Sequence, residues 1–268
     1  PFSRIKSVFA DITEDEARAK GYMKGKLKKE EVFSLLKRST APTTIYKKQK
    51  MDRDDVIDIV DFDVVAWIKS EMRMMLDEEI ARALLLGDGR LASSDDKIDE
   101  NCVRPVVKDS ELFCVHKTVD VAKDATSDAK AKAFIRTVIK SRKDYKGSGN
   151  PTLYTTEDML ADMLLIEDGI GHLLYTSETQ LATVLRVKEI VTVAPMEGTN
   201  GVNNKPLCGV VVNLSDYKIG ADKGGSVSMF DDFDIDYNQQ KYLIETRCSG
   251  ALNVPYSAIS YEMNEAAA

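Results

Sequence analysis

Residues 51–90 read MDRDDVIDIVDFDVVAWIKSEMRMMLDEEIARALLLGDGR, a stretch that predicts one long amphipathic helix with an acidic start and a Gly-Asp-Gly end. Neither Pro nor Gly interrupts residues 63–86. At about 1.5 Å per residue the helix would be roughly 35 Å long, about twice the usual length. Apolar residues recur every three or four positions, so they share one helix face. That face comprises Val64, Val65, Ile68, Met72, Met75, Leu76, Ile80, Ala83 and Leu84.

Both ends of this segment carry residues typical of helix ends. Asp61 is the predicted N-cap, because its carboxylate can accept a hydrogen bond from a backbone N–H of the first turn. Gly87 is predicted to end the helix, because glycine adopts the left-handed conformation at little cost. On pattern alone, the segment is also typical of an ordinary long core helix. Further acids that suit the positive end of the helix dipole are Asp54, Asp55, Asp58 and Asp63.

The composition is that of a soluble globular chain, with 268 residues of which 43% are hydrophobic and 30% are charged. Such a length allows one large or two ordinary domains. No apolar run approaches the roughly 18 residues of a membrane helix, and no signal peptide is visible. Pro1 in place of an initiator Met predicts that upstream residues were removed. Four scattered cysteines without a CxxC pair indicate reduced thiols in a cytosolic protein: Cys102, Cys114, Cys208 and Cys248.

Charge is unevenly distributed along the chain. Residues 1–50 contain 13 Lys and Arg against 6 Asp and Glu, a balance of +7, whereas the whole chain carries −7. Residues 51–268 therefore carry −14. A basic arm on an acidic body can dock on the body of another copy, because complementary potentials favour the correct partner. The alternatives are a solvated Lys-rich loop and a nucleic-acid-binding arm, although few aromatic residues interleave with the basic ones.

Signatures of enzymes are weak. The two histidines, His116 and His172, have no metal-ligand spacing, and the GxSxG nucleophile motif is missing. Residues 21–27 read GYMKGKL, which is one residue short of a phosphate-binding loop and has Leu27 where Ser or Thr should hold magnesium. We therefore predict no catalytic residues, no metal and no cofactor.

The remaining pattern predicts mixed helix and sheet. We expect strands at residues 2–12, 42–46, 188–194, 207–214, 226–237, 240–248 and 254–261, and a polar loop at 91–110. We expect helices at residues 127–145 and 155–167, the second capped by Thr155 or Thr156, and a short helix after Ser177. Residues 31–36 fit a short helix or a strand. Residues 1–50 together predict a long protruding hairpin without a core of its own.

One predicted strand is strongly acidic. Asp232, Asp234 and Asp236 alternate with apolar residues, so at a period of two their carboxylates share one strand face. Three like charges on one face repel one another. They could face water, contact the basic hairpin of another copy, or bind Ca²⁺ through their oxygens. These three interpretations stay open.

The order of these elements, with residues 51–90 at its centre, resembles the HK97-like family of tailed-bacteriophage or prophage major capsid proteins over nearly the whole chain. Glu167-Asp168-Gly169 is similar to the turn after a helix of that family's A domain. The resemblance implies an α+β capsid fold. It assigns residues 1–50 to the E-loop hairpin, 51–90 to the P domain with its spine helix, and 91–215 approximately to the A domain. Residues 216–250 would be the long P-domain strands, and residues 251–268 the return strand and C-terminal tail.

The same resemblance implies a structural protein that self-assembles into an icosahedral phage head enclosing double-stranded DNA. The expected partners are other copies in pentamers and hexamers, scaffolding or portal proteins, and packaged DNA bound without sequence specificity, with no membrane. The expected location is the virion, assembled in the bacterial cytoplasm. An encapsulin-like nanocompartment shell and an Asp-rich metal-dependent hydrolase are the alternatives. The predicted subunit-contact residues are Arg18, Lys20, Lys24, Lys26, Lys28, Lys29, Asp232, Asp234 and Asp236.

Overall fold

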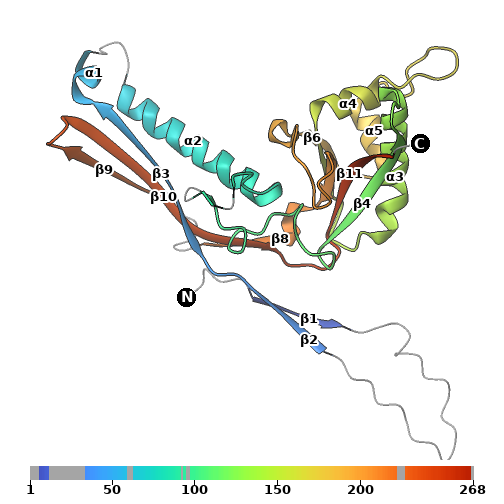
Figure 1. Cartoon of the computed structure of the whole chain (residues 1–268), viewed down its shortest axis with the longest axis horizontal. Coiled ribbons are helices and arrows are strands. Elements are labelled where there is room, and N and C mark those ends of the chain that lie inside the picture. Colours follow the sequence, from blue (N-terminus) through green and yellow to red (C-terminus); the bar gives the residue numbers. More distant parts are fainter. Residues whose placement is uncertain are drawn as a thin grey trace, which may run out of the picture.

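A computed structural model describes residues 6–11, 34–58, 63–91, 93–94, 97–221 and 227–266 of the chain. Three parts are distinct in Figure 1. A long limb combines a sheet with helix α2 (Val64–Leu85), and a lobe combines a second sheet with three helices. The third part is a two-stranded antiparallel hairpin of β1 (Lys6–Asp11) and β2 (Ser34–Ser39), which projects away from the other two. The predicted hairpin is thus confirmed for its described strands.

The limb is built around β10 (Gln239–Leu252), the central strand of an antiparallel sheet. β3 (Thr43–Asp52) pairs along one edge of β10. β9 (Ser228–Asp234) and β8 (Tyr217–Ala221) pair with β10 at its two ends. Between Tyr242 and Cys248, buried residues alternate with more exposed ones along β10, as a sheet with one covered face requires.

Helix α2 covers that face of the limb sheet, as Figure 1 shows. Its 22 residues give a length of roughly 33 Å at about 1.5 Å per residue. The predicted apolar face is confirmed, since Val65 and Ile80 are partly buried on this core and five other members are buried. These five, Val64, Ile68, Met72, Leu76 and Ala83, share the core with Ile45, Tyr242 and Ile244.

The start of the long helix differs from the prediction. Met51 and Asp52 end β3, and residues 53–58 form a separate short helix, α1 (Arg53–Asp58), so residues 51–90 do not form one helix. Asp63 caps α2, because its Oδ1 accepts the Ala66 N–H at 3.0 Å. Asp61, the predicted cap, lies outside the described residues.

The end of the long helix agrees with the prediction. The N–H of Gly87 donates to the carbonyl of Arg82 at 3.1 Å, and Gly87 has a φ of 96°. This left-handed conformation is one that glycine adopts without a steric penalty.

The lobe contains a five-stranded sheet in the order β4 (Cys114–Ala122), β11 (Ala258–Ala266), β7 (Leu207–Val212), β5 (Thr152–Thr155), β6 (Ile190–Thr192). β4 runs parallel to β11 and β5 parallel to β6, and the other pairs are antiparallel. Helices α3 (Ser127–Ser141), α4 (Glu157–Leu164) and α5 (Glu178–Leu185) share one core with this sheet. Short 3-10 helices lie at Arg142–Asp144, Ala194–Met196 and Leu214–Asp216.

Both faces of the lobe sheet are covered. Val211 of β7 packs in the core of α3, α4 and α5, whereas Val210 and Val212 face a second core together with Leu85 and Leu86 at the end of α2. Every residue of β7 is buried, which confirms the predicted apolar strand. This second core joins the limb to the lobe and places α2 at the junction.

Several predicted boundaries were wrong. Thr156 rather than Thr155 caps α4, which ends at Leu164 instead of about 167. The strand expected at 188–194 is only Ile190–Thr192, at the sheet edge and largely exposed. The last strand starts four residues later than expected, after a turn in which Tyr256 has a φ of 54°. β4 was not predicted, because its residues His116, Lys117 and Thr118 interrupt the apolar pattern.

Candidate functional site

The base of the hairpin is fixed to the body by a buried ion pair. Nη2 of Arg38, on β2, donates to Oδ2 of Asp109 at 2.6 Å, and the two side chains are only 6% and 3% exposed. The Arg38 guanidinium also lies 3.8 Å above the ring centre of Phe113. Next to it, Thr40 Oγ1 donates to Ser249 Oγ of β10 at 3.1 Å. These contacts orient the hairpin relative to the limb and the lobe.

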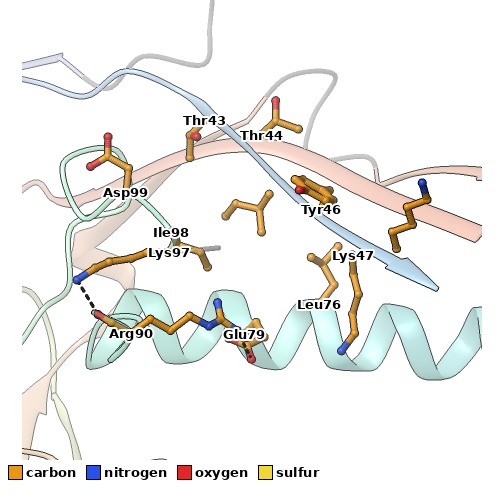
Figure 2. Close-up of a pocket in the computed structure, with 12 residues that line it drawn as sticks. Thr43, Thr44, Tyr46, Lys47, Leu76, Glu79, Arg90, Lys97, Ile98 and Asp99 are labelled. Atoms are coloured by element: carbon orange, nitrogen blue, oxygen red, sulfur yellow. Dashed lines mark hydrogen bonds and ion pairs between the residues drawn. The ribbon is translucent and has the colours of Figure 1, made fainter. Parts of the chain in front are cut away.

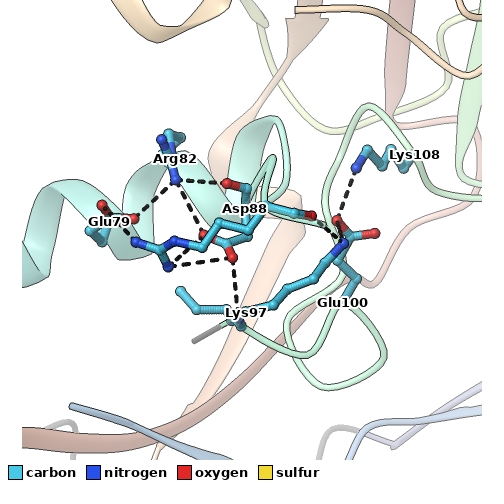
Figure 3. Close-up of polar contacts among 8 residues, drawn as sticks. Glu79, Arg82, Asp88, Lys97, Glu100 and Lys108 are labelled. Carbon is cyan, nitrogen blue, oxygen red and sulfur yellow. Dashed lines mark hydrogen bonds and ion pairs between the residues drawn. The ribbon is translucent and has the colours of Figure 1, made fainter. Parts of the chain in front are cut away.

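A second polar cluster closes the end of α2, as Figure 3 shows. The Asp88 carboxylate is fully buried and forms ion pairs with Arg82 at 3.2 Å and Arg90 at 3.1 Å. Its Oδ2 also accepts the Ile98 N–H at 3.2 Å. Glu79 pairs with both arginines on the outer side. Asp88 therefore ties the helix end to the loop that the sequence predicted as polar.

A cleft of about 410 Å³ lies between β3 and α2, beside this cluster (Figure 2). Ile45, Leu76 and Ile98 supply apolar lining. Lys47 reaches across from β3, and its Nζ donates to Met75 Sδ at 2.9 Å. The other lining residues are Thr43, Thr44, Tyr46, Lys48, Glu79, Arg90, Lys97 and Asp99.

The three predicted acidic contact residues have different surroundings. β9 ends at Asp234, so Asp236 lies in the following turn and not on the strand face that the pattern predicted. Asp232 is paired in register with Lys241 of β10, and Asp234 forms an ion pair with that lysine. Lys241 donates to Asp234 and so lowers the pKa of this carboxyl. The chain itself thus partly neutralises the repulsion expected on this strand.

The basic contact residues predicted from the sequence lie outside the described residues: Arg18, Lys20, Lys24, Lys26, Lys28 and Lys29. In the described ranges, no three His, Cys, Asp or Glu side chains are placed to hold a metal ion. None of the described helices is long and apolar enough to cross a membrane.

Burial weakens the acidity of the cysteine thiols, and the two histidines have different surroundings. Burial and the neighbouring Asp99 raise the pKa of Cys102 to about 11, and burial raises that of Cys114 and Cys208 to about 12. Thiols this weakly acidic are poor nucleophiles near neutral pH. His116 bridges Ser260 Oγ at 2.7 Å and the Asp109 carbonyl at 3.0 Å, while His172 lies in an exposed turn.

Large apolar side chains are exposed at both ends of the molecule. At the far end of the limb, the tip surface consists of Ile57, Phe230, Phe233, Ile235 and Tyr237, with Ile235 85% exposed. In the lobe, residues 165–176 form a turn that exposes Leu165, Ile170, Leu173 and Leu174, with Ile170 84% exposed. Exposed apolar groups of this size indicate interaction surfaces. The prediction from sequence missed them, because exposure within an apolar segment has no signal in the local pattern.

Comparison with known proteins identifies the family of this chain and structures with a similar fold. The profile of the phage capsid family matches residues 3–262. The capsid of a native GTA particle is similar in structure, with a TM-score of 0.67, 12% sequence identity, and coverage of 99% of this chain and 86% of that one. A structure from Mycobacterium phage Ogopogo has a TM-score of 0.66 at 11% identity, covering 98% and 88%. The mature capsid of bacteriophage PhiM1 has a TM-score of 0.59 at 12% identity, covering 98% and 83%. No curated protein sequence matches.

Proposed function

This chain belongs to the phage capsid family, and on that premise we propose that its copies form pentamers and hexamers that close an icosahedral head around double-stranded DNA. It is a major capsid protein with the HK97-like fold, a structural component of the virion. The observation that carries the proposal is the family match over residues 3–262 of a chain with this elongated fold. We further propose that assembly occurs in the host cytoplasm, with scaffolding and portal proteins as partners.

The strand pairing supports the domain roles that we propose. We assign the hairpin of β1 and β2 to the E-loop, the limb sheet with α2 to the P domain, and the lobe to the A domain. β3 begins within the expected E-loop at 1–50 and extends two residues beyond it. Because it pairs with β10 along its whole length, we group it with the P domain. In the part of the chain that the structure describes, β1 and β2 pair only with each other, which suits a segment whose role lies in contact with another copy.

Electron microscopy of the full gene product tests this function. The protein is expressed alone and then with its neighbouring phage genes, and negative-stain images are compared across salt and protein concentrations. We expect closed shells, or rings of five and six subunits, because each symmetric copy repeats the same modest contacts. Monodisperse monomers under all conditions, scaffold included, would refute the proposal. Shells that enclose a protein cargo in place of DNA would favour a nanocompartment.

Shortening the hairpin tests its assembly role separately. A deletion of residues 11–40 would also remove Arg38 and Thr40, which make buried contacts with the body. The sharper variant replaces residues 12–33 with Asn-Gly, because Asp11 and Ser34 are paired in register and a two-residue turn can join them. We expect a wild-type melting temperature and loss of shells. Normal shells from this variant would contradict the E-loop assignment.

A further inference from the structure

A groove lies on the lobe between α3 and the segment that follows α4. It has a volume of about 370 Å³. Its apolar lining consists of Ile135 and Ile139 from α3 and of Ile166, Leu174 and Tyr175 from the facing segment. Ile139 and Leu174 are 36% and 46% exposed, so in the single copy this apolar surface meets water. We call this feature the α3 groove.

Basic side chains border the α3 groove on one side. Lys132, Arg136 and Lys140 line it at intervals of four residues, which places them in one row along the helix. Lys132 pairs with Asp128 at 2.7 Å. Arg136 and Lys140 are exposed and form no ion pair with any carboxylate of the described chain. An occupant of this groove therefore needs apolar side chains accompanied by negative charge.

The turn at 165–176 has that chemistry. Ile170 is 84% exposed at its apex, and Glu167 and Asp168 precede it. Glu167 forms no ion pair within the described residues and is exposed. The carboxylates and the apolar side chain thus lie within four residues of each other on one projecting turn.

Hydrogen bonds made by the side chain and backbone of Asp168 hold this turn in a fixed shape. Asp168 Oδ1 accepts the N–H groups of Ile170 at 2.8 Å and His172 at 3.0 Å, and the Asp168 N–H donates to the His172 carbonyl at 2.8 Å. The same N–H donors, His172 first, lower the pKa of the Asp168 carboxyl, which stays charged. A turn that is already ordered loses little conformational entropy on docking.

We propose that the turn at 165–176 of one copy docks in the α3 groove of the next copy, with Ile170 against the apolar lining and Glu167 beside Arg136 and Lys140. The inference rests on the proposed capsid function, which supplies the second copy. Ile166 and Leu174 of the same turn line the groove of their own copy, whereas Ile170 at the apex does not line it and is 84% exposed. A turn in one place and a groove in another make a head-to-tail contact. Such a contact closes into a ring when the rotation from copy to copy adds up to a full turn, and otherwise it gives an open filament.

Charge complementarity and the apolar lining together favour this occupant over a polyanion. The exposed row of Arg136 and Lys140 could attract phosphates. A phosphate would gain nothing from the apolar lining of Ile135, Ile139 and Leu174. The turn at 165–176 has carboxylates for the basic row and an apolar side chain for the apolar lining. DNA binding at the same row is the competing outcome that the experiment has to separate.

Cysteine cross-linking in assembled particles tests the docking directly. Full-length Ile139→Cys and Ile170→Cys are prepared singly and then mixed before assembly and mild oxidation. We expect a disulfide-linked dimer in the mixture that neither single variant gives. Val202→Cys, at another exposed apolar position of the lobe that is 51% exposed, replaces Ile170→Cys as the matched control. Its mixture with Ile139→Cys should give no dimer above background.

Charge reversal gives an independent readout. Arg136→Glu and Glu167→Lys should each lower particle yield about tenfold, because like charges then meet across the contact. The double variant Arg136→Glu/Glu167→Lys should recover most of the yield. Lys123→Glu, an exposed lysine outside the groove, is the control and should assemble normally. Circular dichroism and melting curves confirm that each variant is folded.

The outcomes separate this inference from the function on which it rests. Wild-type shells with no Ile139–Ile170 cross-link and no effect of reversal would overturn the docking and leave the capsid function intact. Loss of duplex DNA binding in Arg136→Glu, with unchanged assembly, would also overturn it in favour of a polyanion. Failure of the wild-type chain to assemble under any condition would refute the capsid function itself.

Discussion

Replacing Asp109 with Asn should destabilise the subunit more than any surface ion-pair variant. The Arg38 guanidinium is 6% exposed, and Asp109 is the one carboxylate bonded to it among the described residues. The Nε and Nη1 atoms of Arg38 have no hydrogen-bond partner among the described residues. The Asp109 charge therefore offsets most of the cost of burying the guanidinium. Burial already lowers the pKa of Arg38, and Asp109 opposes that shift.

The magnitude follows from what each variant leaves behind. Removing one partner of a buried ion pair costs about 3–5 kcal/mol, because the other charge stays buried without compensation. Phe113 lies 3.8 Å from the guanidinium and retains part of the stabilisation. We therefore expect about 3 kcal/mol for Asp109→Asn. At about 2–4 °C per kcal/mol for a chain of this size, the melting temperature should fall by roughly 6–12 °C.

Replacing Arg38, the other partner of the ion pair, should lower the free energy of unfolding by less. In Arg38→Met the Asp109 carboxylate remains buried, but its Oδ1 still accepts the Ser110 N–H at 2.9 Å. The methionine side chain keeps apolar contact with Phe113. In the double variant Arg38→Met/Asp109→Leu no charge is buried, so its stability should lie within about 1 kcal/mol of the wild type.

Thermal and urea unfolding of the wild type, the two single variants and the double variant measures the coupling between Arg38 and Asp109. The control is Lys188→Met, which removes an exposed ion pair to Glu189 at 3.2 Å and should change stability by no more than about 0.5 kcal/mol. The reasoning fails if Asp109→Asn melts within about 2 °C of the wild type. It also fails if the double variant loses the sum of the two single effects, because the pair would then have no coupling energy.

Two further predictions concern the helix end and the thiols. Gly87→Ala should destabilise the chain by about 1–2 kcal/mol in urea unfolding, because φ is 96° and the new Cβ would lie 3.0 Å from Lys108 Nζ. Gly89→Ala, with a φ of 73° and open space around its Cβ, should cost only the backbone strain, and equal losses for the two would exclude a role for crowding. Cys102, with a pKa of about 11, should be alkylated at pH 8 about 100-fold more slowly than a thiol of pKa about 9, because only the thiolate reacts. The rate should rise about tenfold per pH unit up to pH 10, and fast modification at pH 8 would contradict the assigned environment.

Regular elements with a strong apolar period could be predicted from the sequence. The buried face of α2 was predicted correctly at Val64, Ile68 and Met72, because a long run without Pro or Gly leaves few alternatives to a helix. β7 was recognised because its apolar residues are contiguous, as in a strand that is covered on both faces. The hairpin was recognised because residues 1–50 are too polar to form a core.

Other features depend on contacts between distant residues, and no local pattern contains them. β4 forms because Ala258–Ala266 provides a parallel partner for a segment that has polar residues at its centre. Asp63 is the N-cap of α2, and β3 and the short helix α1 come before it where one continuous helix was predicted. Arg38 and Asp109 are 71 residues apart, so no local pattern pairs them. The acidic period at 232–236 was detected, yet the pairing of Asp234 with Lys241 depends on the hairpin register.

The division between buried and exposed apolar groups separates folding from association in this chain. Among the described residues, three cores hold the body together, and a buried ion pair and a hydroxyl contact fix the base of the hairpin. Ile170 and Ile235, by contrast, stay more than four-fifths exposed at opposite ends of the molecule.

Burying one such side chain contributes about 1.5–3 kcal/mol. That is too little to hold two copies together against the cost of association. It suffices when a closed ring or shell repeats the contact around every copy. Weak single contacts also let a wrongly placed copy dissociate before the shell closes, which a subunit with strongly adhesive surfaces would not allow.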